Sequence, residues 1–255
     1  MPGPFDSAHR KVAWADKHFD DLKRETKAFF AQNPFREVIE PDPANPDHLL
    51  YKIKLDAPIE DSPIPEIVGD IVSNLRAALD HAVYALTNTQ PPRPRSAYFP
   101  FSGDAAGLAA AMDRNCKHVP SEMLPFLRTF HPYKGGNRLL YALNVLRNSD
   151  NHSLLTPMAT QFFRPYTSVS GMGYMEFVLP EHSRWDRAKN EVVFLRAAVD
   201  TKPNYNIDFH FFISFQYIEV LEGYPMLEML ESMGCEVNAT VNAIEAEALR
   251  LGFVR

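Results

Sequence analysis

The chain has few cysteines and no long apolar run, and these two absences exclude several classes of protein. Of its 255 residues only Cys116 and Cys235 are cysteines, which is too few for a disulfide framework, and they form no CxxC pair. Two free thiols are typical of a reducing compartment. No apolar segment approaches the roughly 20 residues that a transmembrane helix needs, and residues 1–25 contain no apolar signal-peptide core. The sequence therefore predicts a cytoplasmic protein without a membrane partner.

An excess of positive charge is also absent. Lysine and arginine number 26 against 32 acidic residues, and the formal net charge of −6 argues against a general polyanion binder. A local basic site stays compatible with this balance. With 45% hydrophobic and 23% charged residues, the composition is that of an ordinary globular protein, which excludes disordered and fibrous classes.

Several catalytic motifs are missing. The sequence contains no GxSxG, no HExxH and no GxxxxGK[ST], and no strand is followed by a glycine-rich turn and a helix in a repeating unit. Rossmann and P-loop folds are thereby excluded, and neither a cofactor nor a bound metal is expected. Cys116 stands among Arg114, Lys117 and His118, basic neighbours that would lower the pKa of a surface thiol.

Hydrophobic periodicity predicts both helices and strands. Apolar residues recur at three- and four-residue steps over 5–32, 62–88 and about 225–251, which is typical of helices. Shorter helices are expected over 104–114 and 121–130, and another from about Asn137. Alternation indicates strands at 48–56, 172–180, 191–199 and 207–220, and in the first of these Lys52 and Lys54 are expected to face solvent.

These elements predict an α+β fold with a helical core interleaved with an antiparallel sheet of about four strands. We expect a single domain over 1–255, in which the helical core covers about 5–155 and 225–251 and a strand-rich segment covers about 160–220. Helices 65–88 and 137–150 carry clean apolar stripes and are expected to pack together. Four leucines should then be nearly fully buried: Leu75, Leu79, Leu143 and Leu146.

A doubled polar pattern is the main functional signal. Arg76 precedes His81 by five residues in one predicted helix, with Asp80 between them. Arg147 precedes His152 by the same distance near the end of another, with Asn148 directly after the arginine and Asp150 before the histidine.

The second copy, Arg147–His152, resembles the R-x4–6-H signature of HEPN domains, which has Asn, Asp or His after the arginine. The resemblance covers this hexapeptide and its helical setting. HEPN domains are helical bundles, and many of them are metal-independent endoribonucleases of toxin–antitoxin and phage-defence systems. More broadly, the runs GDIVSNLRAALDHAVYAL, FPF, LRTFHPY and LNVLRNSDNHSLL resemble a widespread set of uncharacterised bacterial proteins over about 65–155, a likeness that implies no activity.

The resemblance implies a role for each residue. His152 would be the base or acid, Arg147 would hold the scissile phosphate, and Asn148 would orient them. On a straight helix Arg147 and His152 lie about 140° apart, so a second helix has to complete the site. That helix would come from a two-fold partner, which predicts a homodimer, or from a supporting site in the same chain at Arg76, Asp80, His81 and Asp150.

Two alternative functions stand beside this RNA-cleaving or RNA-binding hypothesis, and one further phosphate-binding site is expected. Arg76, Asp80, Arg147 and Asp150 would equally suit a buried charge network, and the protein would then bind a ligand or partner without catalysis. A metal-dependent hydrolase would use Asp80, His81, Asp150 and His152 as ligands. The stretch YKGGNR offers Lys134, Arg138 and a helix N-terminus to a phosphate, or it is a simple helix-entry turn.

Overall fold

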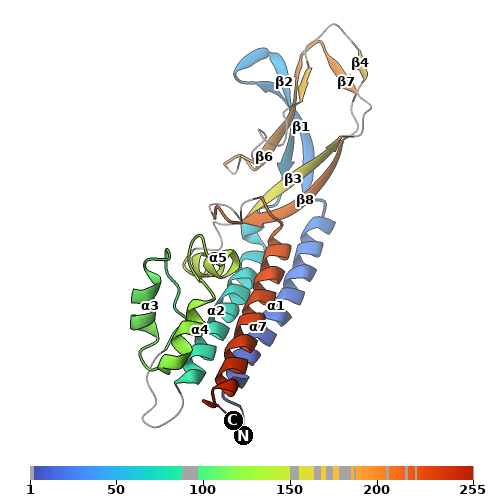
Figure 1. The fold of residues 1–255 in the computed structure, drawn as a ribbon. Coiled ribbons are helices and arrows are strands. Elements are labelled where there is room, and N and C mark those ends of the chain that lie inside the picture. Colours follow the sequence, from blue (N-terminus) through green and yellow to red (C-terminus); the bar gives the residue numbers. More distant parts are fainter. Residues whose placement is uncertain are drawn as a thin grey trace.

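The structure is a computed structural model, and it describes residues 3–87, 97–149, 155–163, 168–170, 175–177, 185–186, 188–204, 207–215, 218–221 and 223–254. The molecule is elongated, with the helices at one end and the strands at the other (Figure 1). The first turn of α1 and the last turn of α7 lie together at the end far from the strands (Figure 1).

Three long helices form the bundle: α1 (Asp6–Ala31), α2 (Ile64–Leu86) and α7 (Met226–Arg250). Each contacts the other two. The predicted helices 5–32, 62–88 and 225–251 are confirmed, because each has an apolar stripe that these contacts bury. Pro65 suits the first turn of α2, where a backbone N–H has no partner within the helix. Within the described residues, no helix combines the length and apolarity that crossing a bilayer requires.

Three shorter helices lie on the side of α2 opposite α1 (Figure 1). They are α3 (Leu108–Asn115), α4 (Leu124–Arg128), which follows a 3-10 turn at Ser121–Met123, and α5 (Arg138–Arg147). The packing of α2 against α5 is confirmed. Leu75 is 1% exposed, and Leu79, Leu143 and Leu146 are fully buried, as their positions on the apolar stripes predict.

A four-stranded antiparallel sheet forms much of the other end. Its order is β1 (Phe35–Asp42), β2 (Asn45–Leu55), β6 (Glu191–Ala198) and β5 (Met175–Phe177). This confirms the expected α+β class. Residues of β2 and β6, among them Tyr51 and Phe194, form a small hydrophobic cluster separate from the helical core.

The predicted strand at 207–220 does not belong to this sheet. β8 (Ile207–Phe215) pairs with β3 (Leu155–Phe163), and β4 (Ser168–Ser170) pairs with β7 (Lys202–Asn204). β8 ends at Phe215, and a turn over 219–221 precedes α7. Ile213 and Phe215 are buried in the helical core, so this strand pair connects the sheet end of the molecule to the bundle.

The expectation that Lys52 faces solvent is wrong, because this side chain is only 6% exposed. Its Nζ lies 2.8 Å from carboxylate oxygens of both Glu40 and Glu191, on the neighbouring strands β1 and β6. Lys54 contacts the same two carboxylates, at 2.6 and 3.3 Å. Hydrogen bonds from Lys52 and Lys54 lower the pKa of Glu40 to about 2. The Lys52 ammonium group on the polar face of β2 is therefore surrounded by carboxylates rather than by water.

Candidate functional site

In the first copy of the doubled pattern, the arginine and the histidine contact different segments that pack against α2. Arg76 donates a hydrogen bond to Asp80 Oδ1, one helical turn away, and its guanidinium lies 4.2 Å from the centre of the Phe101 ring. The backbone N–H of Phe99 donates to the same carboxylate oxygen at 2.9 Å. Arg76 and Asp80 thus hold the segment 97–101 against the helix.

His81 lies on a different face of α2. Its Nδ1 is 2.6 Å from the Ser7 hydroxyl oxygen on α1. A separation of five residues rotates a side chain by about 140° around a helix, which explains why Arg76 and His81 have different neighbours. The structure therefore does not bring the arginine and histidine of this copy to one site.

The second copy begins at the end of α5. Arg147 is the last helical residue and is exposed. Asn148 is the C-cap, and its Nδ2 donates to the backbone oxygen of Asn144 at 2.9 Å. His152 and Asp150 lie outside the described residues.

The two copies show no joint site in the described chain. No described hydrogen bond or ion pair joins Arg147 to Arg76, Asp80 or His81. The described residues also contain no cluster of three or more His, Cys, Asp or Glu side chains suited to a metal ion.

The turn before α5 is held by contacts within the chain. Asn137 caps the helix by accepting hydrogen bonds from the N–H groups of Leu139 and Leu140, both at 3.1 Å. Its Nδ2 donates to Glu236 on α7 at 2.6 Å. A Cβ on Gly136 would clash with the backbone oxygen of His131, so this tight turn requires glycine.

The two cations expected to hold a phosphate here also have partners. Lys134 pairs with Glu219 at 2.9 Å, and this hydrogen bond raises the pKa of Lys134 and lowers that of Glu219. Arg138 stacks on the Tyr224 ring at 4.5 Å and donates to the Met229 sulfur at 3.5 Å. Because carboxylates and helix-capping groups meet at this turn, the geometry resembles a structural junction between α5 and α7 more than an anion site.

The basic neighbours of Cys116 do not activate its thiol. The thiol is buried, and burial raises its pKa to about 11. Arg114 and Lys117 are exposed on either side of it. The sulfur lies 3.7 Å from the backbone oxygen of Tyr98, away from the solvent-facing cations that would otherwise stabilise a thiolate.

A basic and aromatic surface on α1 was not singled out from the sequence. Ser7, Arg10, Lys11 and Trp14 line a hollow of about 270 Å³. The Trp14 side chain is half exposed, Lys17 Nζ lies 4.7 Å from its ring centre, and His18 meets the ring edge-on at 5.6 Å. We call Arg10, Lys11, Trp14, Lys17 and His18 the α1 basic face.

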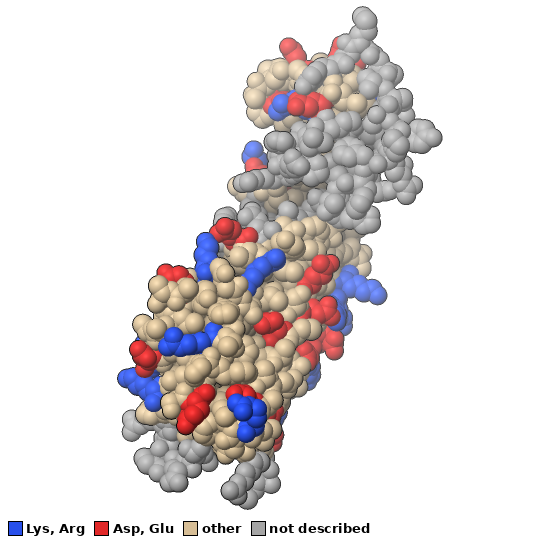
Figure 2. All heavy atoms as spheres, viewed as in Figure 1, with Lys and Arg blue, Asp and Glu red and all other residues tan. Residues whose placement is uncertain are grey.

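The α1 basic face lies next to α2, the helix that carries the first motif copy. Lys11 donates to Asn74 on α2 at 3.0 Å, and Ser7 contacts His81. The helical spacing in HRKVAWADKH, with cations and an aromatic residue within two turns, is the signal that would have revealed this surface. Elsewhere on the helical end, Figure 2 shows acidic and basic side chains interspersed on the face seen there.

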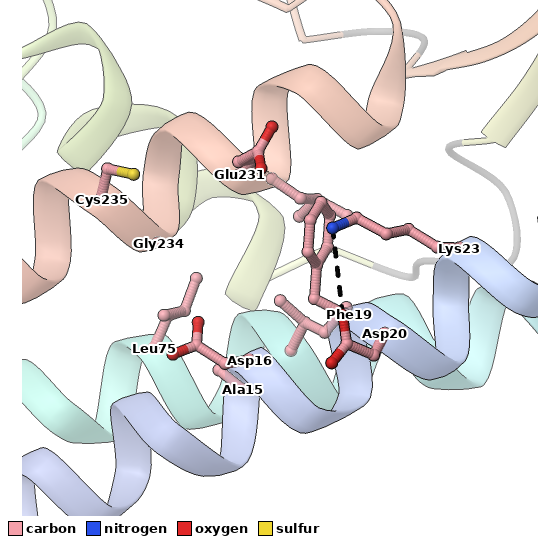
Figure 3. Close-up of a pocket in the computed structure, with 11 residues that line it drawn as sticks. Ala15, Asp16, Phe19, Asp20, Lys23, Leu75, Glu231, Gly234 and Cys235 are labelled. Carbon is pink, nitrogen blue, oxygen red and sulfur yellow. Dashed lines mark ion pairs between the residues drawn. The ribbon is translucent and has the colours of Figure 1, made fainter.

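A second hollow, of about 270 Å³, lies where α1, α2 and α7 meet (Figure 3). Asp16 and Asp20 come from α1 and Glu231 from α7, while Leu75 of α2 contributes to its apolar wall. Lys23 pairs with Asp20 at 3.9 Å, as the dashed line in Figure 3 marks. The acidic lining makes this hollow unsuited to a phosphate backbone.

Comparison of the chain with protein-family models, with curated proteins and with solved structures finds no match. The function of the chain therefore has to be inferred from its residues and their geometry.

Proposed function

We propose that this protein binds RNA through the α1 basic face, and that the HEPN-like hexapeptide at the end of α5 supplies an endoribonuclease site. The observation that supports binding most strongly is the exposed Trp14 ring flanked by Arg10, Lys11 and Lys17. Proteins that hold single-stranded nucleic acid combine cations, which contact the phosphates, with aromatic rings on which bases stack.

Local charge favours this surface in spite of the negative net charge. Arg10, Lys11 and Lys17 lie within two turns of one helix, and the acidic residues Asp21 and Glu25 further along α1 are paired with Arg24 at 2.8 and 3.3 Å. Screening limits the influence of more distant charges to about 8–10 Å at physiological salt. A strand lying over Trp14 would have Arg10, Lys11 and Lys17 beside it, whereas Asp16 lines the separate acidic hollow between α1, α2 and α7.

Cleavage would be the work of the second motif copy. Arg147 is exposed at the end of α5, so its guanidinium is accessible to a phosphate. In this proposal Asn148 orients the substrate, and His152 transfers the proton of the ribose 2′-hydroxyl. Because Arg147 has no described link to the first copy, a two-fold partner is the favoured source of the second half of the site, which makes the protein a homodimer.

Binding is tested by fluorescence anisotropy with labelled single-stranded RNA in excess EDTA. Trp14→Ala should weaken binding by about tenfold to a hundredfold, since stacking contributes about 1–3 kcal/mol per base. Tyr98→Ala is the matched control, because both side chains are 49% exposed and Tyr98 lies outside the α1 basic face. Equal affinity of the Trp14→Ala variant and the parent protein would overturn the proposed surface.

The salt dependence of affinity tests the phosphate contacts. Arg10→Gln and Lys17→Gln should each reduce the slope of log affinity against log salt by about 0.7. Lys189→Gln, at an exposed lysine remote in sequence, should leave the slope unchanged. Slopes that respond equally to all three changes would indicate nonspecific attraction to the protein as a whole.

Cleavage is tested separately in the same buffer. The products should carry 2′,3′-cyclic phosphate, and DNA, which lacks the 2′-hydroxyl, should remain intact. His152→Ala should slow cleavage about 10²–10⁴-fold, and Arg147→Ala should weaken both binding and turnover. Sedimentation at micromolar concentration tests the homodimer. If a folded, RNA-binding protein leaves the RNA intact, the proposed cleavage is refuted and only the proposed RNA binding remains.

A further inference from the structure

We propose that a cavity between α1, β8 and the start of α7 binds a small anionic amphiphile, of which a medium-chain carboxylate is the simplest example. This site is separate from the α1 basic face and goes beyond the proposed RNA function.

The cavity has a volume of about 280 Å³ and is mainly apolar. The α1 residues that line the cavity are three or four positions apart, and this spacing places them on one face of the helix. β8 and the start of α7 contribute aromatic and aliphatic side chains. The lining residues are Lys23, Thr26, Lys27, Phe30, Phe211, Phe212, Ile213, Pro225, Met226 and Leu227.

An unpartnered polar atom lies in this apolar lining. Thr26 is 7% exposed, and its hydroxyl has no hydrogen-bond partner in the structure. A buried hydroxyl without a partner is costly to the folded state, and most such groups in proteins are satisfied. A ligand oxygen in the cavity would accept the hydrogen bond that the protein itself does not provide.

The charges around the cavity specify the sign of the ligand. Lys23 and Lys27 are exposed at its rim, and none of its described lining residues is acidic. Lys23 forms an ion pair with Asp20, in which Nζ lies 3.9 Å from Oδ1. No described ion pair or hydrogen bond engages Lys27, so its ammonium group is the main attraction for an anionic head.

The size of the cavity limits the ligand. At about 30 Å³ for each water-sized group, its volume holds roughly nine such groups. Octanoate matches this size, with a carboxylate for Thr26 and Lys27 and an alkyl chain for Phe30 and the β8 side chains. Burying that chain supplies the hydrophobic contribution to affinity.

The test compares three probes that share an alkyl chain and differ in head group. Octanoate, n-octanol and octylammonium are titrated into the full-length protein by isothermal calorimetry. The proposal expects octanoate to bind, octanol to bind at least tenfold more weakly, and octylammonium to bind most weakly. Octanol binding as tightly as octanoate, tighter binding of octylammonium, or no heat with octanoate at millimolar concentration would each overturn it.

Two variants locate the head group. Thr26→Val keeps the shape and removes the hydroxyl, and should weaken octanoate binding about tenfold, the size of one hydrogen bond to a charged group. Thr201→Val is the matched control, because Thr201 is also buried with an unpartnered hydroxyl but does not line the cavity. Lys27→Gln should weaken octanoate binding and leave octanol binding unchanged.

Unchanged octanoate affinity in a folded Thr26→Val protein would overturn the proposal. RNA binding and cleavage are independent of this result, because neither Thr26 nor Lys27 belongs to the α1 basic face.

Discussion

Substitutions at Arg76 and Asp80 separate a structural role of the first motif copy from a catalytic one. Asp80 Oδ1 accepts hydrogen bonds from the Arg76 guanidinium and from the Phe99 backbone N–H, and Arg76 also stacks on Phe101. The side chains of Arg76 and Asp80 are 16% and 21% exposed, so solvent screens their interaction only in part. We expect both residues to stabilise the fold.

The expected magnitude is set by the hydrogen bonds that each substitution removes. Asp80→Ala removes the acceptor from a charged donor and from a backbone amide, and each such hydrogen bond contributes about 1–3 kcal/mol. Because the site is partly exposed, water replaces part of the lost hydrogen bonding. We therefore expect the free energy of unfolding to decrease by about 2–4 kcal/mol. Arg76→Met keeps the aliphatic packing and should cost less, about 1–2 kcal/mol, including the interaction with Phe101.

Urea unfolding followed by far-ultraviolet circular dichroism measures both variants and the double variant. The double variant should be less destabilised than the sum of the two single changes, because the residues share one interaction. RNA cleavage by the Arg76→Met protein, assayed below its unfolding transition, should be unchanged. A stability change below about 0.5 kcal/mol together with abolished cleavage would refute the structural role.

Three further outcomes are expected. Leu79→Ala, at a fully buried position of α2, should destabilise the fold by about 2–5 kcal/mol in the same urea assay, and a cost below about 1 kcal/mol would contradict the packing described. Because the pKa of Glu40 is lowered from 4.5 to about 2, its pairing stabilises the protein above pH 4.5 and this contribution is lost as the pH falls toward 2. Acid unfolding monitored by tryptophan fluorescence should therefore show a weaker pH dependence for Glu40→Gln, and an unaltered profile would argue against the ion pairs. Iodoacetamide at about pH 8 should label exposed Cys235 and spare Cys116 in the native protein, as detected by mass spectrometry, and equal labelling would contradict the burial of Cys116.

The helical part of the fold is largely predictable from the sequence because its apolar stripes are long. α2 illustrates this: its apolar positions recur along the whole helix, and residues such as Val68, Leu75 and Leu79 are all buried. A stripe of that length defines both the element and the face that it buries. The ends are less certain: α5, for example, ends at Arg147, whereas the stripe predicts a helix to about 150.

The sheet is less predictable because its stability comes from pairing over long sequence distances. β1 contains Pro41 and mostly charged or exposed residues, so no alternation marks it as a strand. It becomes a strand by pairing with β2. Likewise Lys52 is buried because Glu191, 139 residues away, lies on the neighbouring strand. Neither partner can be identified from local periodicity.

At the candidate site, too, the contacts of single side chains depend on residues far away in the sequence. On α2 an arginine and a histidine five positions apart turn toward different neighbours, and only the packed structure reveals that these are the segment 97–101 and Ser7 of α1. The second copy differs in one respect, because its arginine, Arg147, is the last residue of α5, whereas Arg76 lies in the middle of α2. The failure of the first copy to form an arginine–histidine pair therefore does not transfer to the second. The role of the second copy is decided by the His152→Ala cleavage assay. The His81→Ala variant tests whether the first copy takes part in cleavage.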